Sequence, residues 1–271
     1  YEIVDCDWSS DVCSSDLICD RCCDRCRNVA TCHRQLIKKI IMKVSLVSYS
    51  QPTEEFAQQG IDDAQELIAY CARVSNPANQ FNTETSEKLI KYLVRHKHWS
   101  PLEMVSACCE ITTTRDIARQ ILRHRSFSFQ EFSQRYADPT AELDDAFVLR
   151  EARFQDNKNR QNSIEMDLTI DEHRQISYQW ENLQKDLLNK VKDVYSWAIT
   201  KGIAKEQARA VLPEGLTVSR MYMNGTLRSW IHFIELRSGN GTQKEHMEVA
   251  RACAKVIAAI FPMAAELVAQ D

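Results

Sequence analysis

The residues between positions 115 and 136 carry the groups best suited to binding an anion. Arg115, Arg119 and Arg123 recur every four residues beside an apolar stripe, which predicts a helix with three guanidinium groups along one flank. The helical spacing stops at residues 123–125, Arg-His-Arg, and serine then alternates with phenylalanine before residues 133–135, Ser-Gln-Arg. Fixed cations at a helix end, followed by hydroxyl groups and another arginine, predict a site for anionic oxygens.

The type of cation separates a binding site from an ordinary solvated face. No lysine lies between Lys97 and Lys158. Between Lys205 and Lys244 the only lysine or arginine residues are Arg209, Arg220, Arg228 and Arg237. Solvated faces accept lysine freely, whereas planar, bidentate recognition of phosphate selects arginine. The bias favours a phosphate site, with a structural arginine network as the alternative.

Composition narrows the class of protein. The chain has 271 residues and a formal net charge of -4, so a broad basic surface for nucleic acid is not expected. The most apolar stretch, residues 252–269, is interrupted by Lys255, Pro262 and Glu266, which predicts a buried helix and not a membrane span. We therefore expect a soluble, cytoplasmic protein. Gly-x-Gly-x-x-Gly and Gly-Lys-Ser/Thr motifs are absent from the sequence, which argues against a Rossmann or P-loop site.

Residues 1–41 differ from the rest of the chain. They hold 7 of the 11 cysteines, including Cys19-x-x-Cys22 and Cys23-x-x-Cys26. Thiolates at this spacing could share a zinc ion, but no second pair follows 12 to 20 residues later. Residues 7–17 resemble a translated sequencing-adapter peptide, so we expect residues 1–41 to be a non-native or read-through segment without order. Residues 42–271 are then expected to form a single catalytic domain that begins at Met42 and binds no metal.

Hydrophobic periodicity predicts the order of elements in this domain. Strands are expected at 42–49, 104–114, 146–149 and 216–223, and helices at 58–73, 83–97, 115–123, 170–200, 205–212, 226–237 and 245–269. The apolar and aromatic residues of the 170–200 helix are expected in a core or a subunit contact. Cys71, Cys108, Cys109 and Cys253 fall inside these elements, which argues against an exposed nucleophilic thiol.

The motif of residues 123–136 resembles the signature of the flavin-dependent thymidylate synthases. In both, Arg-His-Arg is followed after seven residues by a serine and then by an arginine and tyrosine. Further segments match in the same order: His98-x-Ser100-Pro-x-Glu103, Ala208-Arg209-x-Val-Leu-Pro213, and Leu227-Arg228 through Leu236-Arg237. The resemblance covers residues 42–270.

The resemblance implies an α+β fold in which an antiparallel sheet packs with long helices, and not a Rossmann fold. It implies a homotetramer whose active sites are shared between subunits. The implied reaction is reductive methylation of dUMP to dTMP, with FAD as cofactor. Methylenetetrahydrofolate would supply the carbon and NADPH the hydride, while nucleic acid and membranes are not expected partners.

The resemblance also implies roles for individual residues. Arg237 would face the uracil edge and stabilise charge as N3 ionises, and His98 would shape access to the flavin. The residues implied to bind dUMP are Gln120, Arg123, Glu131, Ser133, Gln134, Arg135, Arg209 and Arg237. Those implied to bind FAD are Ser75, Ser100, Glu103, Arg123, His124, Arg125, Glu131, Thr226, Arg228 and His232.

Some assignments stay open at this stage. Asn224 and Thr226 are alternative contacts to the flavin, and the loop at 239–242 has no assigned role. Ser133 is interpreted as a phosphate ligand, because the sequence identifies no histidine base for it. One rival function is another flavin or nucleotide enzyme on the same scaffold. A second rival is a zinc-cluster protein that places the arginine helix on nucleic acid, which would show steeply salt-dependent binding.

Overall fold

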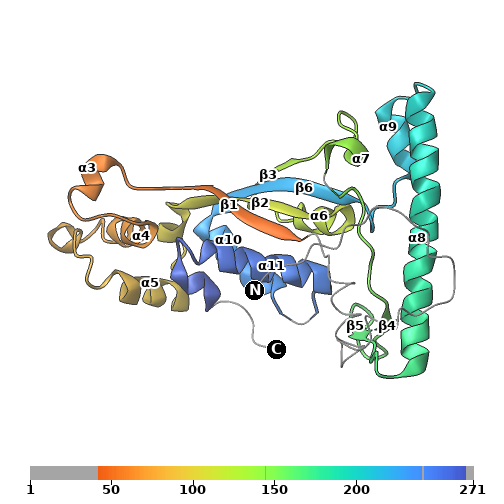
Figure 1. Ribbon diagram of the computed structural model, residues 1–271. Helices are drawn as coiled ribbons and strands as arrows, with labels where there is room; N and C mark the ends of the chain where they lie inside the picture. Colours follow the sequence, from red (N-terminus) through yellow and green to blue (C-terminus); the bar gives the residue numbers. More distant parts are fainter. Residues whose placement is uncertain (1–41, 144, 240, 267–271) are drawn as a thin grey trace, which may run out of the picture. The chain divides into compact units, whose positions relative to one another are not determined.

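The described structure is built around a four-stranded antiparallel sheet. The computed structural model describes residues 42–143, 145–239 and 241–266, so the segment 1–41 lies outside the described residues. The strand order is β1 (Lys43–Tyr49), β2 (Ser106–Thr114), β6 (Val218–Thr226) and β3 (Ser128–Glu131) (Figure 1). β2 and β6 pair along their whole length, from Ser106 opposite Thr226 to Thr114 opposite Val218. Alternate residues of both strands are buried, so one face of the sheet packs on the core.

Both central strands continue into helices without an intervening loop. β2 leads into α6 (Arg115–Ile121), and β6 leads into α10 (Leu227–Arg237). The junction residues Thr114 and Thr226 keep extended backbone angles, and the Thr226 side chain accepts a hydrogen bond from the backbone N–H of Ser229, as an N-cap does. Because the strands are antiparallel, the two helices start at opposite ends of the strand pair.

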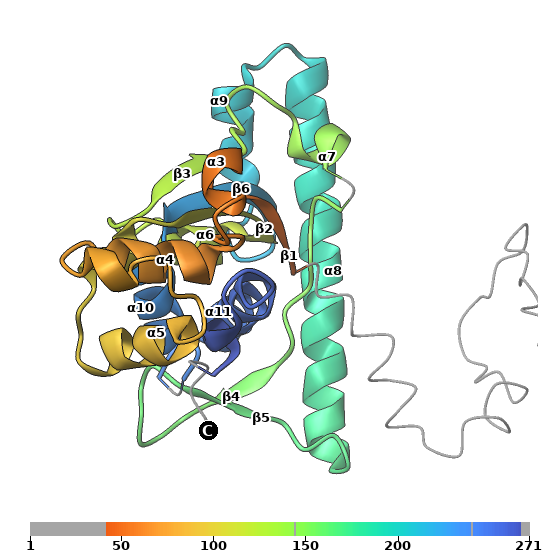
Figure 2. The same cartoon turned by 90° about the vertical axis from the view of Figure 1, so that its left-hand side faces the viewer.

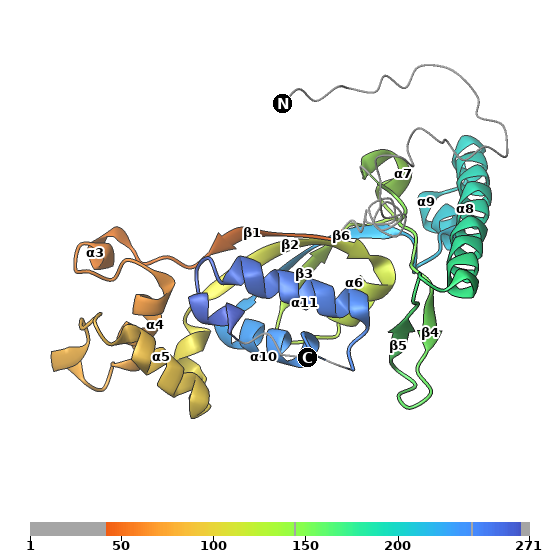
Figure 3. The same cartoon turned by 60° about the horizontal axis from the view of Figure 1, so that its bottom comes forward.

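The core lies between the sheet and its helices. α11 (Lys244–Ile257) packs against β1, α10 and α6 (Figures 2 and 3). Large apolar side chains from every layer are fully buried, among them Ile111, Ile121, Met221, Trp230, Phe233 and Val249. The indole N–H of Trp230 is buried as well, and it donates to the carbonyl of Ala107 at 3.0 Å.

Two peripheral groups complete the described residues. The first comprises α3 (Glu54–Ala57), α4 (Ala64–Ala72), the 3-10 turn Pro77–Asn79, α5 (Ser86–Arg95) and the 3-10 turn Ser100–Glu103. The second comprises α7 (Pro139–Glu142), β4 (Arg153–Gln155), β5 (Ser163–Glu165), α8 (Asp171–Thr200), α9 (Lys205–Ala208) and the 3-10 turn Arg209–Val211. A last 3-10 turn, Pro262–Ala265, packs on α11 and belongs to the main core. α8 packs on α9, where Val191, Tyr195 and Leu212 form a second small core.

The α+β class with an antiparallel sheet is confirmed, but several element boundaries differ from the predictions. The helix predicted from residue 58 begins at Ala64, because Asp63 caps it by accepting from the Glu66 N–H at 2.8 Å. The last predicted helix ends at Ile257, since Phe261 is extended before Pro262. The predicted strand at 146–149 is reduced to one bridge, between Phe147 and Thr217. The β4–β5 hairpin was not predicted.

Candidate active site

The C-terminal ends of α6 and α10 meet at a contact between Arg237 and His124. The Arg237 Nε–H donates to His124 Nε2 at 3.1 Å. Burial, and secondarily the charge of Arg237, lowers the pKa of His124 to about 4, so this imidazole is neutral near pH 7. A neutral ring that accepts at Nε2 carries its proton on Nδ1. The contact uses the Nε–H of Arg237, and within the described residues its two Nη groups form no hydrogen bond or ion pair, so they are available to a ligand.

Gln120 lies beside this contact, in a cluster that α11 completes. Its amide donates to Gln243 Oε1 at 2.7 Å, and its own Oε1 lies 3.2 Å from Nδ1 of His246. His246 is fully buried, and its ring centroid is 6.2 Å from that of His124. The fold therefore gathers three of the predicted residues, Gln120, His124 and Arg237, at one place. Sequence reasoning missed Gln243 and His246, although polar residues at the start of an apolar helix were a signal.

A second group of predicted residues surrounds a shallow cavity of about 340 Å³. Its lining includes Ser133, Arg135 and Glu206, and the guanidinium of Arg135 is 3.2 Å from the Glu206 carboxylate. Arg209 follows α9 directly as its C-cap residue and is half-buried. A hydroxyl, an exposed arginine and a nearby second arginine can hold a phosphate, with the anion replacing Glu206 as the partner of Arg135.

Gln134, expected at the same nucleotide, does not offer its side chain. It is 3 % exposed, and its Nε2 has no hydrogen-bond partner among the described residues. Burial of this side chain means that only the backbone of Gln134 could reach a phosphate. The assignment of Gln134 to the nucleotide therefore stays a prediction.

The arginines between positions 115 and 125 are of two kinds. Some form ion pairs within the fold, and others form none among the described residues. Arg115 is buried and lies 3.5 Å from Glu131, whose carboxylate also accepts from Ser219 at 2.7 Å. Arg119 forms a two-pronged contact with Glu214 at 2.8 Å. The structural network therefore explains the first part of the run. Among the described residues, the exposed Arg123 and Arg125 form no ion pair, so these two remain available for a ligand.

The residues expected at the flavin form two further groups. In one, Arg228 pairs with Glu103, and the His232 ring lies 4.6 Å from that of Trp99. In the other, the exposed His98 lies 6.0 Å from the Tyr92 ring, beside Lys97 with its positive φ of 59°.

The remaining residues expected at the flavin differ in whether their side chains are exposed or already bonded within the fold. Ser75 and Ser100 are exposed in turns next to helices. Thr226 uses its hydroxyl as the cap of α10, whereas Asn224 is exposed on the open face of β6. Of these two alternatives, Asn224 is the better placed for an external ligand. No hydrogen bond or ion pair within the described ranges links the Arg135, Arg228 and His98 groups to the Arg237 group.

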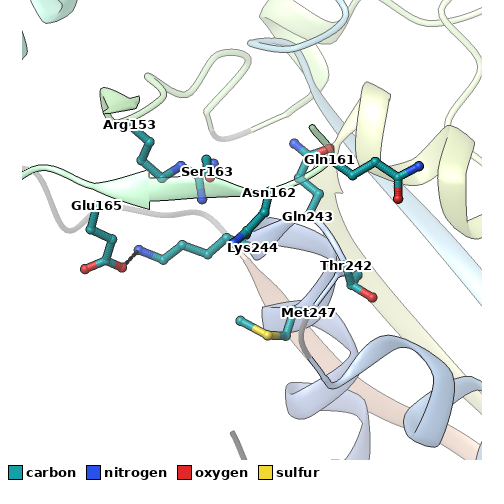
Figure 4. A pocket seen from close by; sticks show the side chains of 9 residues that line it. All are labelled: Arg153, Gln161, Asn162, Ser163, Glu165, Thr242, Gln243, Lys244 and Met247. Carbon is teal, nitrogen blue, oxygen red and sulfur yellow. Dashed lines mark hydrogen bonds and ion pairs between the residues drawn. The ribbon is translucent and has the colours of Figure 1, made fainter. Parts of the chain in front are cut away.

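A separate polar cavity of about 210 Å³ opens between the β4–β5 hairpin and the start of α11 (Figure 4). Lys244 bonds Glu165 at 2.5 Å and Glu151 at 2.7 Å, and Arg153 pairs with Glu245. The charges around this cavity are therefore largely matched. The sequence predicted no role for these residues.

Comparison with known proteins decides the family. The family model described as thymidylate synthase complementing protein matches residues 58–263. The chain belongs to this family. Within it, the chain is 48 % identical over 225 residues to a "Probable flavin-dependent thymidylate synthase" of Paramecium bursaria Chlorella virus 1, covering 83 % of this chain and 98 % of that relative. It is 50 % identical over 200 residues to the flavin-dependent thymidylate synthase of Synechocystis, covering 73 % and 86 % of the two chains.

A solved structure supports the same thymidylate synthase complementing protein fold. The UMP/dUMP methylase PolB of Streptomyces cacaoi, bound with 5-Br dUMP, superposes with a TM-score of 0.66 at 26 % identity. The match covers 83 % of this chain and 93 % of PolB. The family and fold expected from the residue 123–136 motif are thereby confirmed.

The described residues lack two kinds of feature. None of the helices placed there is both long enough and apolar enough to cross a bilayer. The same part of the chain contains no cluster of three or more histidine, cysteine, aspartate or glutamate side chains arranged to hold a metal ion.

Proposed function

We propose that this protein is a flavin-dependent thymidylate synthase that methylates dUMP reductively to dTMP. FAD is the cofactor, methylenetetrahydrofolate supplies the carbon and NADPH supplies the hydride. The observation that carries the proposal is the pairing of Arg237 with a neutral His124 beside Gln120, in a chain of this family. It presents a fixed cation at the meeting point of two helices, and its two Nη groups form no hydrogen bond or ion pair in the described part of the chain.

The phosphate of dUMP is assigned to the second group of residues. Ser133, Arg135 and Arg209 supply a hydroxyl and two guanidinium groups, and the cavity beside them opens to solvent. Charge-assisted hydrogen bonds from arginine to phosphate are strong and directional, so they fix the position of the nucleotide. Gln134 contributes through its backbone only.

The base is assigned to Arg237. Loss of the N3 proton from uracil places negative charge on the ring, and this makes C5 nucleophilic. A guanidinium facing that edge stabilises the charge electrostatically and transfers no proton. Because His124 is neutral, it orients Arg237 through its lone pair without removing a proton from it. Gln120 lies on the same side and is assigned to the nucleotide.

The residues proposed for FAD fit a large anionic cofactor. The exposed Arg123 and Arg125 have no ion-pair partner within the described ranges, so both can neutralise phosphate oxygens. Ser75, Ser100, Glu103, His124, Glu131, Arg228 and His232 complete the assigned set, with Asn224 in place of Thr226, because the Thr226 hydroxyl caps α10. The pair between Arg228 and Glu103 must rearrange if Arg228 takes a phosphate. When bound, FAD passes the hydride from NADPH toward the one-carbon unit, and His98 is assigned to the access route.

The proposal includes a homotetramer with active sites shared between subunits. Two observations support it. Within the described ranges no hydrogen bond or ion pair joins the Arg135 group to the Arg237 group, and α8 exposes Trp180, Leu183, Leu187 and Trp197 at between 43 % and 58 %. A row of exposed apolar side chains is typical of an interface. We also propose a cytoplasmic location, which agrees with the four free thiols of the described residues.

Complementation tests the activity. A chain starting at Met42 is expected to rescue a thymidine-requiring bacterial strain, and the same chain carrying Arg237→Ala is expected not to. Arg174→Ala, on the exposed surface of α8, is the matched control and should rescue fully. Rescue by the Arg237 variant would remove this residue from its role, and failure of the unaltered chain despite good expression would overturn the function.

A spectroscopic test distinguishes the rival enzyme on the same scaffold. The purified protein should be yellow, and dUMP should shift the flavin absorbance bands. If another pyrimidine nucleotide shifts the bands and dUMP does not, the substrate assignment is wrong while the flavin assignment stands.

A further inference from the structure

A chain of side-chain hydrogen bonds runs from Glu245 to His246 through the candidate nucleotide site. Gln243 Nε2 donates to the Glu245 carboxylate at 3.0 Å, and Gln120 Nε2 donates to Gln243 Oε1 at 2.7 Å. At the far end, Gln120 Oε1 lies 3.2 Å from Nδ1 of His246. Arg150 and Arg153 flank Glu245, so the chain starts at a carboxylate held in its ionised form.

The carboxylate fixes the direction of every bond in this chain. An ionised carboxylate only accepts, so Gln243 must turn its NH2 toward Glu245 and its oxygen toward Gln120. Gln120 must then give its NH2 to Gln243 and turn its oxygen toward His246. His246 can complete the chain only by donating from Nδ1, which leaves Nε2 as an unprotonated acceptor. The bond directions require a proton on Nδ1, and burial lowers the pKa of His246 to about 3, so His246 is the neutral Nδ1–H tautomer near pH 7.

We propose that His246 is a positioning residue, whose Nδ1–H anchors the amide oxygen of Gln120 and so holds the Gln120 side chain in one position at the nucleotide. The inference rests on the proposed function, because it takes Gln120 as a contact of dUMP. Without this donor, the amide would be held only at its NH2 end, by Gln243, and its oxygen could swing away from its place at the nucleotide. His246 touches neither substrate nor cofactor and acts only through Gln120.

The burial of His246 argues against a purely stabilising role. The residue is fully buried, and its Nε2 has no hydrogen-bond partner in the described part of the chain. An unsatisfied buried acceptor destabilises a fold, so an apolar residue of similar size would pack there at lower cost. A group that costs stability yet orients a site residue fits a functional placement.

The experiment compares His246→Leu with His246→Asn. Leucine fills the space without a donor, whereas the asparagine NH2 can replace the Nδ1–H. Calorimetric titration of the purified protein with dUMP is expected to show about fivefold to tenfold weaker binding for His246→Leu, the loss of one hydrogen bond. His246→Asn should bind within about twofold of wild type. The melting temperature of His246→Leu should be equal to or above that of the wild type.

A double-mutant cycle with Gln120→Ala separates action through Gln120 from a general effect. In the Gln120→Ala background, His246→Leu is expected to change dUMP affinity by less than about twofold. An equal loss in both backgrounds, or weaker binding that follows a lowered melting temperature, would overturn the proposal. Wild-type protein that fails to bind dUMP would instead overturn the proposed function, so the two failures are distinguishable.

Discussion

Phe127 lies directly against the bare backbone of Gly225, so that a Cβ added at this glycine would stand 2.4 Å from Cδ1 of the ring. The ring cannot move aside freely, because it is buried and packs edge-on against Trp230 at 4.9 Å between centroids. Phe127 also follows Arg125 by two residues, so the contact holds the Arg-His-Arg motif against β6.

We expect Gly225→Ala to destabilise the protein by about 1–3 kcal/mol through overpacking. Activity should fall as well, since a displaced ring moves residues 123–125. Gly215→Ala is the matched control, because an added Cβ there meets nothing within 4 Å. Thermal unfolding of both variants gives the measurement, and equal melting temperatures would show that Phe127 yields without cost.

A half-buried arginine holds the junction of β2 and α6 to the start of α11. Arg150 contacts Asp116 at 2.7 Å and Glu245 at 3.0 Å, and it also donates to the carbonyl of Gly215 at 3.0 Å. Arg150→Met would leave two carboxylates without this partner in a poorly hydrated place. The expected loss is about 3–5 kcal/mol in the free energy of unfolding, measured by urea denaturation.

The control for this loss is an exposed pair. Arg174 and Asp171 pair on α8 with side chains 48 % and 81 % exposed, so Arg174→Met should cost less than about 1 kcal/mol. Similar losses for the two variants would mean that the Arg150 network is as well hydrated as the surface.

Acid should weaken the fold through the buried His246 and the half-buried His124. Burial, followed by the charge of Arg237, lowers the pKa of His246 to about 3 and that of His124 to about 4, against the ordinary value of 6.5. Between the folded and the ordinary pKa the unfolded chain binds more protons. The contribution of each histidine is therefore complete above pH 6.5 and is lost as the pH falls.

Mutation of His246 measures how much this residue contributes to the pH dependence of the free energy of unfolding. Between pH 6 and pH 4, the free energy of unfolding should fall less steeply for His246→Leu than for the wild type, by about 1.4 kcal/mol per pH unit. Urea titrations at several pH values measure both slopes. Identical slopes would show that His246 is protonated in the folded protein at these pH values.

The pair of Arg135 and Glu206 predicts opposite effects on phosphate binding. Arg135→Gln removes a charge-assisted hydrogen bond and should raise the KM for dUMP by about tenfold or more. Glu206→Gln removes the competing carboxylate 3.2 Å away and should leave KM unchanged or lower it. Steady-state kinetics at fixed ionic strength compares the two variants. A raised KM for both would mean that Glu206 positions Arg135 and does not compete with the substrate.

Local patterns predicted the sheet and most helices, because their apolar residues recur at clear periods. β2 and α8 were placed within two residues of their ends. The four-residue strand β3 was harder to predict, since its pairing with β6 through Ser128 and Asn224 is a tertiary contact. The strands of the β4–β5 hairpin are too short to show an alternation of apolar side chains from which they could be predicted.

The site was also predictable only in part, because several of its contacts join segments that are distant in the sequence. Arginine usage pointed to an anion site, but it could not separate Arg119, which pairs with Glu214 almost a hundred positions later, from the unpaired Arg123. The burial of Gln134 and the chain from Glu245 to His246 depend on how distant segments meet. No spacing within one segment carries that information.

β2 continues directly into α6, and β6 continues directly into α10. Neither junction has a loop that could absorb a change in chain length. One extra residue inserted at Thr114 or Thr226 would turn the following helix by about 100° about its axis, since each helical residue advances by that angle. Either insertion would carry one partner of the Arg237 and His124 pair away from the other. The chemistry of this chain is therefore tied to the exact length of two strand-to-helix junctions, and length changes are better absorbed at the β4–β5 turn.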